Sequence, residues 1–334
     1  MLTRREALLG AAGIVGGTVF GACGGSGGRD RVTVANTTGG LNMTMAELMR
    51  QKRFLEVSGV DFEVLDVADG SKILGGIVGG SIHASMMSGI AQVFPAIERG
   101  ADLKIIGGSI LVPALGLYTS QDEVRSLRDL EGRVVGSGSV GALTHMMTMA
   151  LLKEAGVDVA KVQFANIGSS ADVFRAVVGG KIAAGVGPAS IALESARQGV
   201  RLLDGGNMAE RLSNFTYSAA WASGRAIAER RDALVQALAA YARLYRFVQA
   251  ADAQDAFVRA RAAVYPNVAA AEHLAEFNFV QQYKPFATSL VLEPGRLEYL
   301  QKLNADFGNQ QRVLPFAEVA DMSLAEAALR LLDS

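Results

Sequence analysis

The sequence repeats itself at a spacing of 100 residues, and this repeat limits the possible folds more than any other feature. Residues 78–84 (VGGSIHA) match residues 178–184 (VGGKIAA), and the same spacing relates residues 69–71 to residues 169–171. A repeat of this length exceeds the roughly 20–45 residues of a solenoid module. It therefore indicates a duplicated α/β unit.

Each copy of the repeat alternates short apolar segments with longer segments of helical pattern. We expect strands at 32–35, 62–67, 82–87, 103–107, 134–136, 162–166, 183–186 and 200–203. We expect helices between them, at 43–52, 71–78, 90–98, 143–155, 171–178 and 191–198. Strands that alternate with helices form mostly parallel, doubly wound sheets. The predicted fold class is α/β, with two such lobes and a ligand cleft between them.

The 334 residues are enough for two domains. We expect residues 31–118 and 220–334 to form the first lobe and residues 119–219 to form the second. In this scheme residues 111–120 leave the first lobe and residues 214–223 return to it.

Helical patterns surround and follow the second lobe. Residues 122–130 are predicted to form a short capped helix where the chain enters that lobe. Further helices are expected at 229–250, 253–261, 269–282, 294–307 and 324–332. Each has a single apolar stripe, so we expect these helices to pack on the first lobe and complete it.

Residues 1–30 have the features of an export signal followed by a glycine-rich tether. Arg4 and Arg5 precede an apolar run over 7–22, and Cys23 follows small residues. The segment resembles a bacterial lipoprotein signal of the twin-arginine type, which implies that Cys23 becomes a lipidated N-terminus. A plain secretory signal with an incidental cysteine is the alternative. Either way, we expect a periplasmic protein or one on the outer face of the cell membrane, lipid-anchored if Cys23 is modified.

The composition excludes several classes of function. The 32 Lys and Arg residues nearly balance 33 Asp and Glu residues, so no strong positive field favours nucleic acid. Cys23 is the only cysteine, which excludes disulfide frameworks and cysteine zinc sites. The three histidines, His83, His145 and His273, show no metal-ligand spacing. We therefore predict no metal and no cofactor, and no Gly-x-Ser-x-Gly motif indicates a hydrolase.

Residues 127–136 (LRDLEGRVVG), with Gly138, Ser139 and the helix ending at 151–157, resemble a known family. These motifs, in this order, resemble the solute-binding component of ABC importers, within the group that binds aliphatic sulfonates, taurine, nitrate and thiamine-pyrimidine precursors. The resemblance covers about residues 31–260. It implies a periplasmic-binding-protein type II fold, a small-molecule ligand captured by lobe closure, and delivery to a permease and its ATPase. It also implies a monomer without catalytic activity.

Two departures from the family pattern leave the ligand open. His83 and Ala183 stand where the family often has an acidic residue, and the loop at 36–42 lacks the aromatic-proline form of many sulfonate binders. One alternative is an enzyme of thiamine-pyrimidine-type metabolism on the same fold, although the cysteine-rich motif of those enzymes is missing. The other alternative is a ligand-sensing subunit.

The candidate ligand site lies in the loops that follow the strands, because ligands of open α/β sheets bind at the carboxyl ends of the strands. These loops are rich in Gly, Ser and Thr and precede helices, whose free N–H groups attract anions. The candidate residues are Asn36, Thr37, Thr38, Asn42, Asp69, Ser88, Ser137, Ser139, Val140, Thr144, His145, Ser169, Pro188 and Trp221.

Several of these residues also have structural interpretations. Ser137, Ser139 and Thr144 favour ligand contact, because their loop has more polar groups than one helix cap needs. Asp69 is equally a helix cap, and Trp221 stacks on a ligand or simply packs. The predicted loops contain no Arg or Lys. We therefore expect a weakly anionic or aromatic organic ligand.

Overall fold

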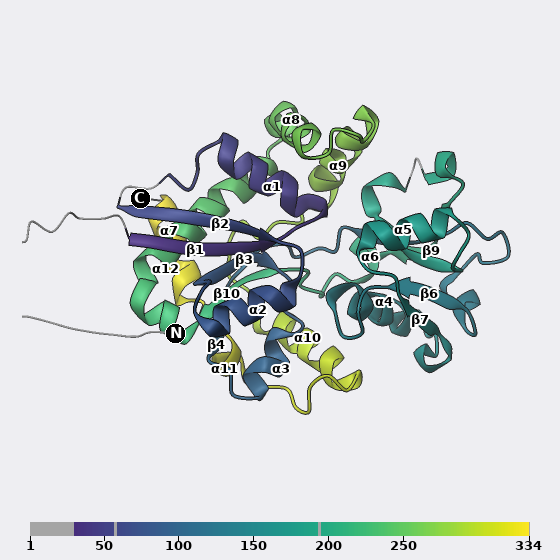
Figure 1. Cartoon of the computed structure of the whole chain (residues 1–334), viewed down its shortest axis with the longest axis horizontal. Coiled ribbons are helices and arrows are strands. Elements are labelled where there is room, and N and C mark those ends of the chain that lie inside the picture. Colours follow the sequence, from purple (N-terminus) through teal and green to yellow (C-terminus); the bar gives the residue numbers. More distant parts are fainter. Residues whose placement is uncertain (1–29, 57–58, 193–194, 334) are drawn as a thin grey trace, which may run out of the picture.

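The computed structural model describes residues 30–56, 59–192 and 195–333. It contains two five-stranded sheets, each flanked by helices, which lie side by side as two lobes (Figure 1). This arrangement confirms the predicted α/β fold with two mostly parallel sheets. The predicted signal segment and Cys23 lie outside the described residues.

The first sheet has the strand order β2-β1-β3-β10-β4. Its strands are β1 (Asp30–Thr37), β2 (Val60–Val67), β3 (Ala84–Ser88), β4 (Leu103–Gly108) and β10 (Ala219–Ser223). Strand β1 runs parallel to β2 and β3, whereas β10 runs antiparallel to β3 and β4. The connecting helices are α1 (Gly40–Gln51), α2 (Gly70–Gly79) and α3 (Val93–Glu98).

The second sheet repeats this topology in the order β7-β6-β8-β5-β9. Its strands are β5 (Leu115–Thr119), β6 (Val134–Ser137), β7 (Gln163–Asn166), β8 (Ala184–Pro188) and β9 (Arg201–Asn207). Here β6 is parallel to β7 and β8, and β5 is antiparallel to β8 and β9. The helices are α4 (Leu143–Glu154), α5 (Ser170–Val178) and α6 (Met208–Arg211), with one-turn 3-10 helices η1 (Leu127–Leu130), η2 (Val159–Lys161), η3 (Ala189–Ile191) and η4 (Ser195–Gln198).

The matching segments of the repeat form the same turn in both lobes. Gly80 ends α2 and Gly180 follows α5, and their φ angles of 80° and 66° lie in the left-handed region that favours glycine. Ile82 and Ile182 then enter the core before β3 and β8 begin. The repeated segment of the sequence therefore forms the same helix-to-strand connection in each lobe.

The two crossings between the lobes differ from expectation. Each contains a strand that inserts antiparallel into a sheet, β5 in the second and β10 in the first. The boundary expected after residue 118 falls inside β5, since all of Leu115–Thr119 is buried in the second sheet. The expected helix at 122–130 is reduced to the single turn η1, and the described residues of 191–198 form short 3-10 turns.

The C-terminal region is helical, as expected. It comprises α7 (Gly224–Val248), η5 (Ala251–Ala253), α8 (Gln254–Val264), α9 (Ala270–Tyr283), α10 (Pro294–Asp306), α11 (Phe316–Val319) and α12 (Ser323–Asp333). Helix α12 packs on α7 and β4, and α8 packs on α1, so these helices extend the first lobe. Helices α9 and α10 also contact the second lobe, at η3 and α4. Within the described ranges, no helix combines the length and apolar character that crossing a membrane requires.

Candidate functional site

The loops that follow strands of the two lobes meet at the junction between the lobes. Leu143, at the start of α4, lies over Gly89, which follows β3; a Cβ at Gly89 would be 3.2 Å from Leu143 Cδ2. A Cβ at Gly141 would likewise lie 3.3 Å from Asn309 Oδ1, beyond α10. The carboxyl ends of the strands in both lobes therefore face a common region, as the fold class predicts.

A buried ion pair lies at this junction. Arg261 of α8 and Glu276 of α9 approach to 3.5 Å between Nη2 and Oε2, and their side chains are only 9% and 4% exposed. Ser190 of η3, in the second lobe, donates a hydrogen bond from its hydroxyl to Glu276 Oε2. Glu276 therefore links a cation of the first lobe to a hydroxyl of the second.

Two tyrosines lie near this ion pair. The Arg261 guanidinium lies 4.9 Å from the centre of the Tyr265 ring, and the Tyr265 hydroxyl donates to the Gly40 carbonyl oxygen at 3.1 Å. Burial, with the charge of Glu276 nearby, raises the pKa of Tyr217 to about 12. The junction cluster is defined as Ser190, Tyr217, Arg261, Tyr265 and Glu276.

The junction cluster retains hydrogen-bonding capacity. Arg261 Nε and Nη1 are buried and have no hydrogen-bond partner among the described residues, and the same holds for Nδ1 of neighbouring His273. Burial, reinforced by the positive charge of Arg261, lowers the pKa of His273. Unpaired guanidinium N–H groups in a buried setting are suited to an oxygen-rich or anionic group of a solute.

Three of the predicted site residues are enclosed within the first lobe. The Asn36 amide and the Tyr241 hydroxyl form two hydrogen bonds of 2.9 Å and 3.2 Å. The Trp221 indole N–H donates to Ser88 Oγ at 2.7 Å, and Asn36, Ser88 and Trp221 are all 0% exposed. Their polar groups are used by the core, so we do not keep these residues in the candidate site.

Other predicted residues fix the loops. Asp69 Oδ1 accepts a hydrogen bond from Ser71 N–H at 2.8 Å, and Ser169 caps α5 in the same way. The Asn42 amide donates to the Thr37 carbonyl oxygen at 2.9 Å. The Gly138 N–H donates to Thr144 Oγ1 at 3.1 Å. These contacts shape the loops, and the Asn42 amide, which is 5% exposed, also donates to the Met87 carbonyl oxygen.

The loop before α4 divides into buried and exposed parts. His145 is 6% exposed; its Nδ1 accepts a hydrogen bond from Gly141 N–H at 3.2 Å, and burial lowers its pKa. The Ser137 hydroxyl is buried and donates to the Gly138 carbonyl oxygen at 3.0 Å. Ser139 and Val140 are exposed, and Val140 is 81% exposed. This loop therefore presents Ser139 and Val140 at its surface, held in place by the buried histidine.

Two further predicted residues lie beside the junction cluster. Thr38 is exposed just before α1, whose first residue, Gly40, is bonded to Tyr265. Pro188 ends β8 and precedes Ser190, and its carbonyl oxygen accepts a hydrogen bond from the buried Tyr118 hydroxyl at 2.6 Å.

Sequence reasoning missed Arg261 and Glu276, although a signal was present. Arg261 shares the buried stripe of α8 with Phe257 and Ala260, and Glu276 shares that of α9 with Phe277. Charged residues at apolar-stripe positions indicate buried, paired charges. In the described ranges, no group of three or more His, Cys, Asp or Glu side chains is arranged to hold a metal ion.

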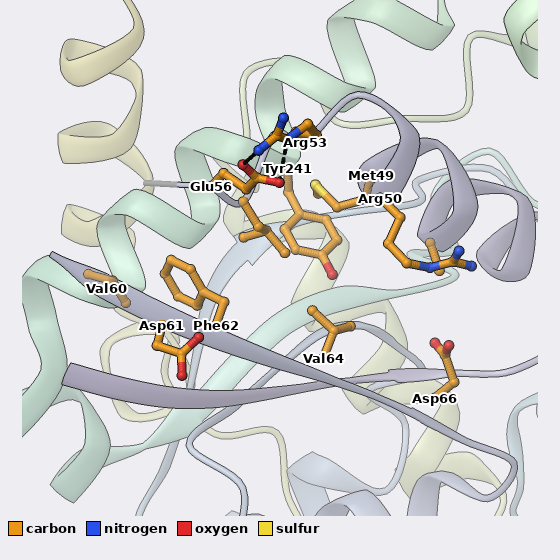
Figure 2. A pocket seen from close by; sticks show the side chains of 12 residues that line it. Met49, Arg50, Arg53, Glu56, Val60, Asp61, Phe62, Val64, Asp66 and Tyr241 are labelled. Atoms are coloured by element: carbon orange, nitrogen blue, oxygen red, sulfur yellow. Dashed lines mark hydrogen bonds and ion pairs between the residues drawn. The ribbon is translucent and has the colours of Figure 1, made fainter. Parts of the chain in front are cut away.

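A cavity of about 540 Å³ lies apart from the junction cluster. Helix α1, strand β2 and Tyr241 of α7 line it on the flank of the first lobe (Figure 2). We take the junction cluster as the candidate site, because side chains of both lobes are bonded to each other there, whereas the lining of the cavity comes from the first lobe alone.

Comparisons with known proteins agree with this two-lobed arrangement. The alkanesulfonate-binding protein SsuA from Xanthomonas axonopodis pv. citri, solved with bound MOPS, has a TM-score of 0.71 and 16% identity, over 88% of this chain and 98% of that one. The periplasmic aliphatic sulphonate binding protein SsuA from Escherichia coli has a TM-score of 0.70 and 15% identity, over 88% and 92%. The desulfurization enzyme DSZB has a TM-score of 0.64 and 15% identity, over 91% and 99%.

These identities are low, so the solved structures establish a shared fold. The search of curated proteins found no match. The family model described as NMT1/THI5 like matches residues 43–254, which is more than half of the 334 residues. The chain therefore belongs to the NMT1/THI5-like family.

Proposed function

We propose that this protein is an extracytoplasmic solute-binding protein that closes its two lobes on a small organic molecule and delivers it, as a monomer, to an ABC permease and its ATPase. The observation that carries this proposal is the junction cluster, where Glu276 of the first lobe bonds Ser190 of the second. A solute bound there contacts both lobes only when they are closed, which is the requirement for ligand-driven closure.

The chemistry of the cluster favours a weakly anionic or aromatic ligand. Arg261 Nε and Nη1 have no hydrogen-bond partner among the described residues, and the Tyr265 ring lies against the Arg261 guanidinium. Glu276 already neutralises part of the positive charge of Arg261, which disfavours highly charged anions. Two proteins of the same fold are described as sulfonate binders, so sulfonates belong in the first ligand panel.

A thermal-shift panel of sulfonates, aromatic carboxylates and pyrimidines tests this proposal. A ligand at 100 times its Kd stabilises the folded state by about 2.7 kcal/mol, which a thermal shift detects readily. Arg261→Lys keeps the charge beside Glu276 but loses the planar set of donors, so we expect at least about tenfold weaker binding. Arg259→Lys, the same change at an exposed position of α8, is the matched control and should bind normally.

The double variant Arg261→Gln/Glu276→Gln removes both buried charges together and so avoids an uncompensated carboxylate. Wild-type affinity in both Arg261 variants would show that the solute binds elsewhere. Recovery of the ligand unchanged after long incubation is expected of a binding protein. Conversion of the ligand into a product would instead favour the enzyme alternative, since the desulfurization enzyme DSZB has the same fold.

We also propose that the chain is exported and lipid-anchored through Cys23, by the twin-arginine route. The E. coli structural relative is described as periplasmic, which supports export. Lipid labelling of wild type and Cys23→Ser tests the anchor, and labelling that survives the substitution would contradict it. Uptake measured in a deletion strain separates transport from a sensing role, since a sensor leaves uptake intact.

A further inference from the structure

The cavity on the flank of the first lobe is formed because α1 does not cover the edge strand that follows it. Helix α1 packs mainly against α8, and β2 is the outermost strand of its sheet. Alternate residues of β2 point to one face. Figure 2 shows Phe62, Val64 and Asp66 on β2, with Met49 and Arg50 on α1 across the cavity. The opening of about 540 Å³ is large enough for a small organic molecule.

The walls of this flank cavity combine apolar and aromatic side chains with charged ones. Val64 is 37% exposed although it is a β-branched residue in a strand, and Met49 and Tyr241 are buried behind the opening. The Tyr241 hydroxyl is bonded to both polar atoms of the Asn36 amide, so Tyr241 presents its ring to the cavity. These surfaces suit an aromatic or branched-alkyl group.

The lining carries two arginines and three carboxylates. Arg50 is paired with Glu47 and Arg53 with Glu56. Asp61 and Asp66 form no ion pair with any described residue. Burial raises the pKa of Asp66, and Arg50 offsets this only in part. An arriving cation would therefore gain the attraction of Asp61 and Asp66, which are exposed and take part in no ion pair within the described ranges.

We propose that the flank cavity binds a small organic cation, an amine carried on an aromatic or branched-alkyl body. Its ammonium group lies against Asp66, and its body lies against Phe62, Val64 and the Tyr241 ring. This second site is on the flank of the first lobe and shares no residue with the junction cluster. Its occupancy does not depend on solute binding between the lobes.

Titration calorimetry with 2-phenylethylamine, and with 3-phenylpropionate as the anionic analogue of the same body, tests the proposal. We expect the wild type to bind the amine and not the acid. Asp66→Asn should weaken amine binding about tenfold or more, because the charge partner is lost while the shape is kept. Asp252→Asn, the same change at an exposed site outside the cavity, should have no effect.

Val64→Trp places a large side chain in the cavity from an exposed position, and it should abolish amine binding without loss of fold, as checked by circular dichroism. Arg261→Lys should leave amine binding unchanged, which separates this site from the proposed solute site. Amine binding that survives both Asp66→Asn and Val64→Trp, equal binding of the acid, or no binding to the wild type would each overturn the proposal.

Discussion

Individual buried side chains in this protein are held in defined protonation states by single contacts. His145 is the clearest case, since its Nδ1 must be unprotonated to accept the Gly141 N–H at 3.2 Å. Its burial lowers the pKa, and that of an unfolded histidine is about 6.5. The unfolded state therefore takes up the proton first as the pH falls.

We expect the free energy of unfolding to decrease as the pH falls below about 6.5 and through the lowered pKa of folded His145. His145→Gln keeps an acceptor for Gly141 but cannot titrate, so it should lose less stability over this range. Urea denaturation of both proteins at pH 7.5 and at pH 5 measures the difference. An identical loss in the two proteins would mean that His145 does not contribute.

The sequence predicted where the polar loops lie, but it did not predict which residues their side chains bond. The polar loops at 36–42 and 137–144 lie at strand ends, as predicted. Asn36 and Trp221 were candidates because of their residue types and positions. Their hydrogen bonds to Tyr241 and Ser88 join residues separated by 205 and 133 positions, and local pattern carries no information about such pairs.

At the scale of elements, equivalent helices of the two lobes begin with equivalent caps. Asp69 caps α2, and Ser169 caps α5 in a capping box with Asp172. The repeat in the sequence therefore encodes helix starts as well as turns. The elements it could not predict were β5 and β10, because insertion of a short buried segment into a sheet depends on the two strands that receive it.

Asp69→Ala and Ser169→Ala should each lower the free energy of unfolding by about 1 kcal/mol, since each removes an N-cap acceptor. Chemical denaturation measures this loss, and Lys72→Ala on the exposed face of α2 is a control expected to stay within about 0.5 kcal/mol. If capping is the whole role of these residues, solute affinity will change less than about twofold. A larger loss of affinity would return them to the ligand site.

At the scale of the whole molecule, polar contacts on α10 hold the two lobes together. Lys153 of α4 pairs with Asp306 at 2.5 Å, and the Tyr299 hydroxyl donates to Glu154 Oε1 at 2.7 Å. Both carboxylates and the lysine are partly exposed, so each contact contributes no more than about 1 kcal/mol. Lobes joined in this way can separate to admit a solute, and the solute supplies the difference in free energy that closes them.

The double variant Lys153→Met/Tyr299→Phe should therefore bind solute about two- to tenfold more weakly, mainly through faster dissociation. Small-angle scattering without ligand should show a larger radius of gyration for the double variant than for the wild type. Lys302→Met breaks an ion pair within α10 that does not reach the second lobe, and it serves as the control. Unchanged dissociation in the double variant would show that these contacts do not stabilise the closed form.

The overall architecture was largely predictable, because strand and helix periodicity and the repeat are properties of the chain itself. The junction cluster was not, because α9, which packs on α8, meets η3 only after both lobes are assembled.

The order in which the two sheets receive their antiparallel strands, β5 and β10, has a consequence for biosynthesis. All five strands of one sheet lie within the continuous stretch from Leu115 to Asn207. The other sheet must accept its penultimate strand, β10, after that stretch has left the ribosome. Until then β3 and β4 have no common neighbour, and their unpaired edges are open to other chains. The internal stretch is thus able to mature first, and the residues on either side of it are the part of the nascent chain that most needs protection from aggregation.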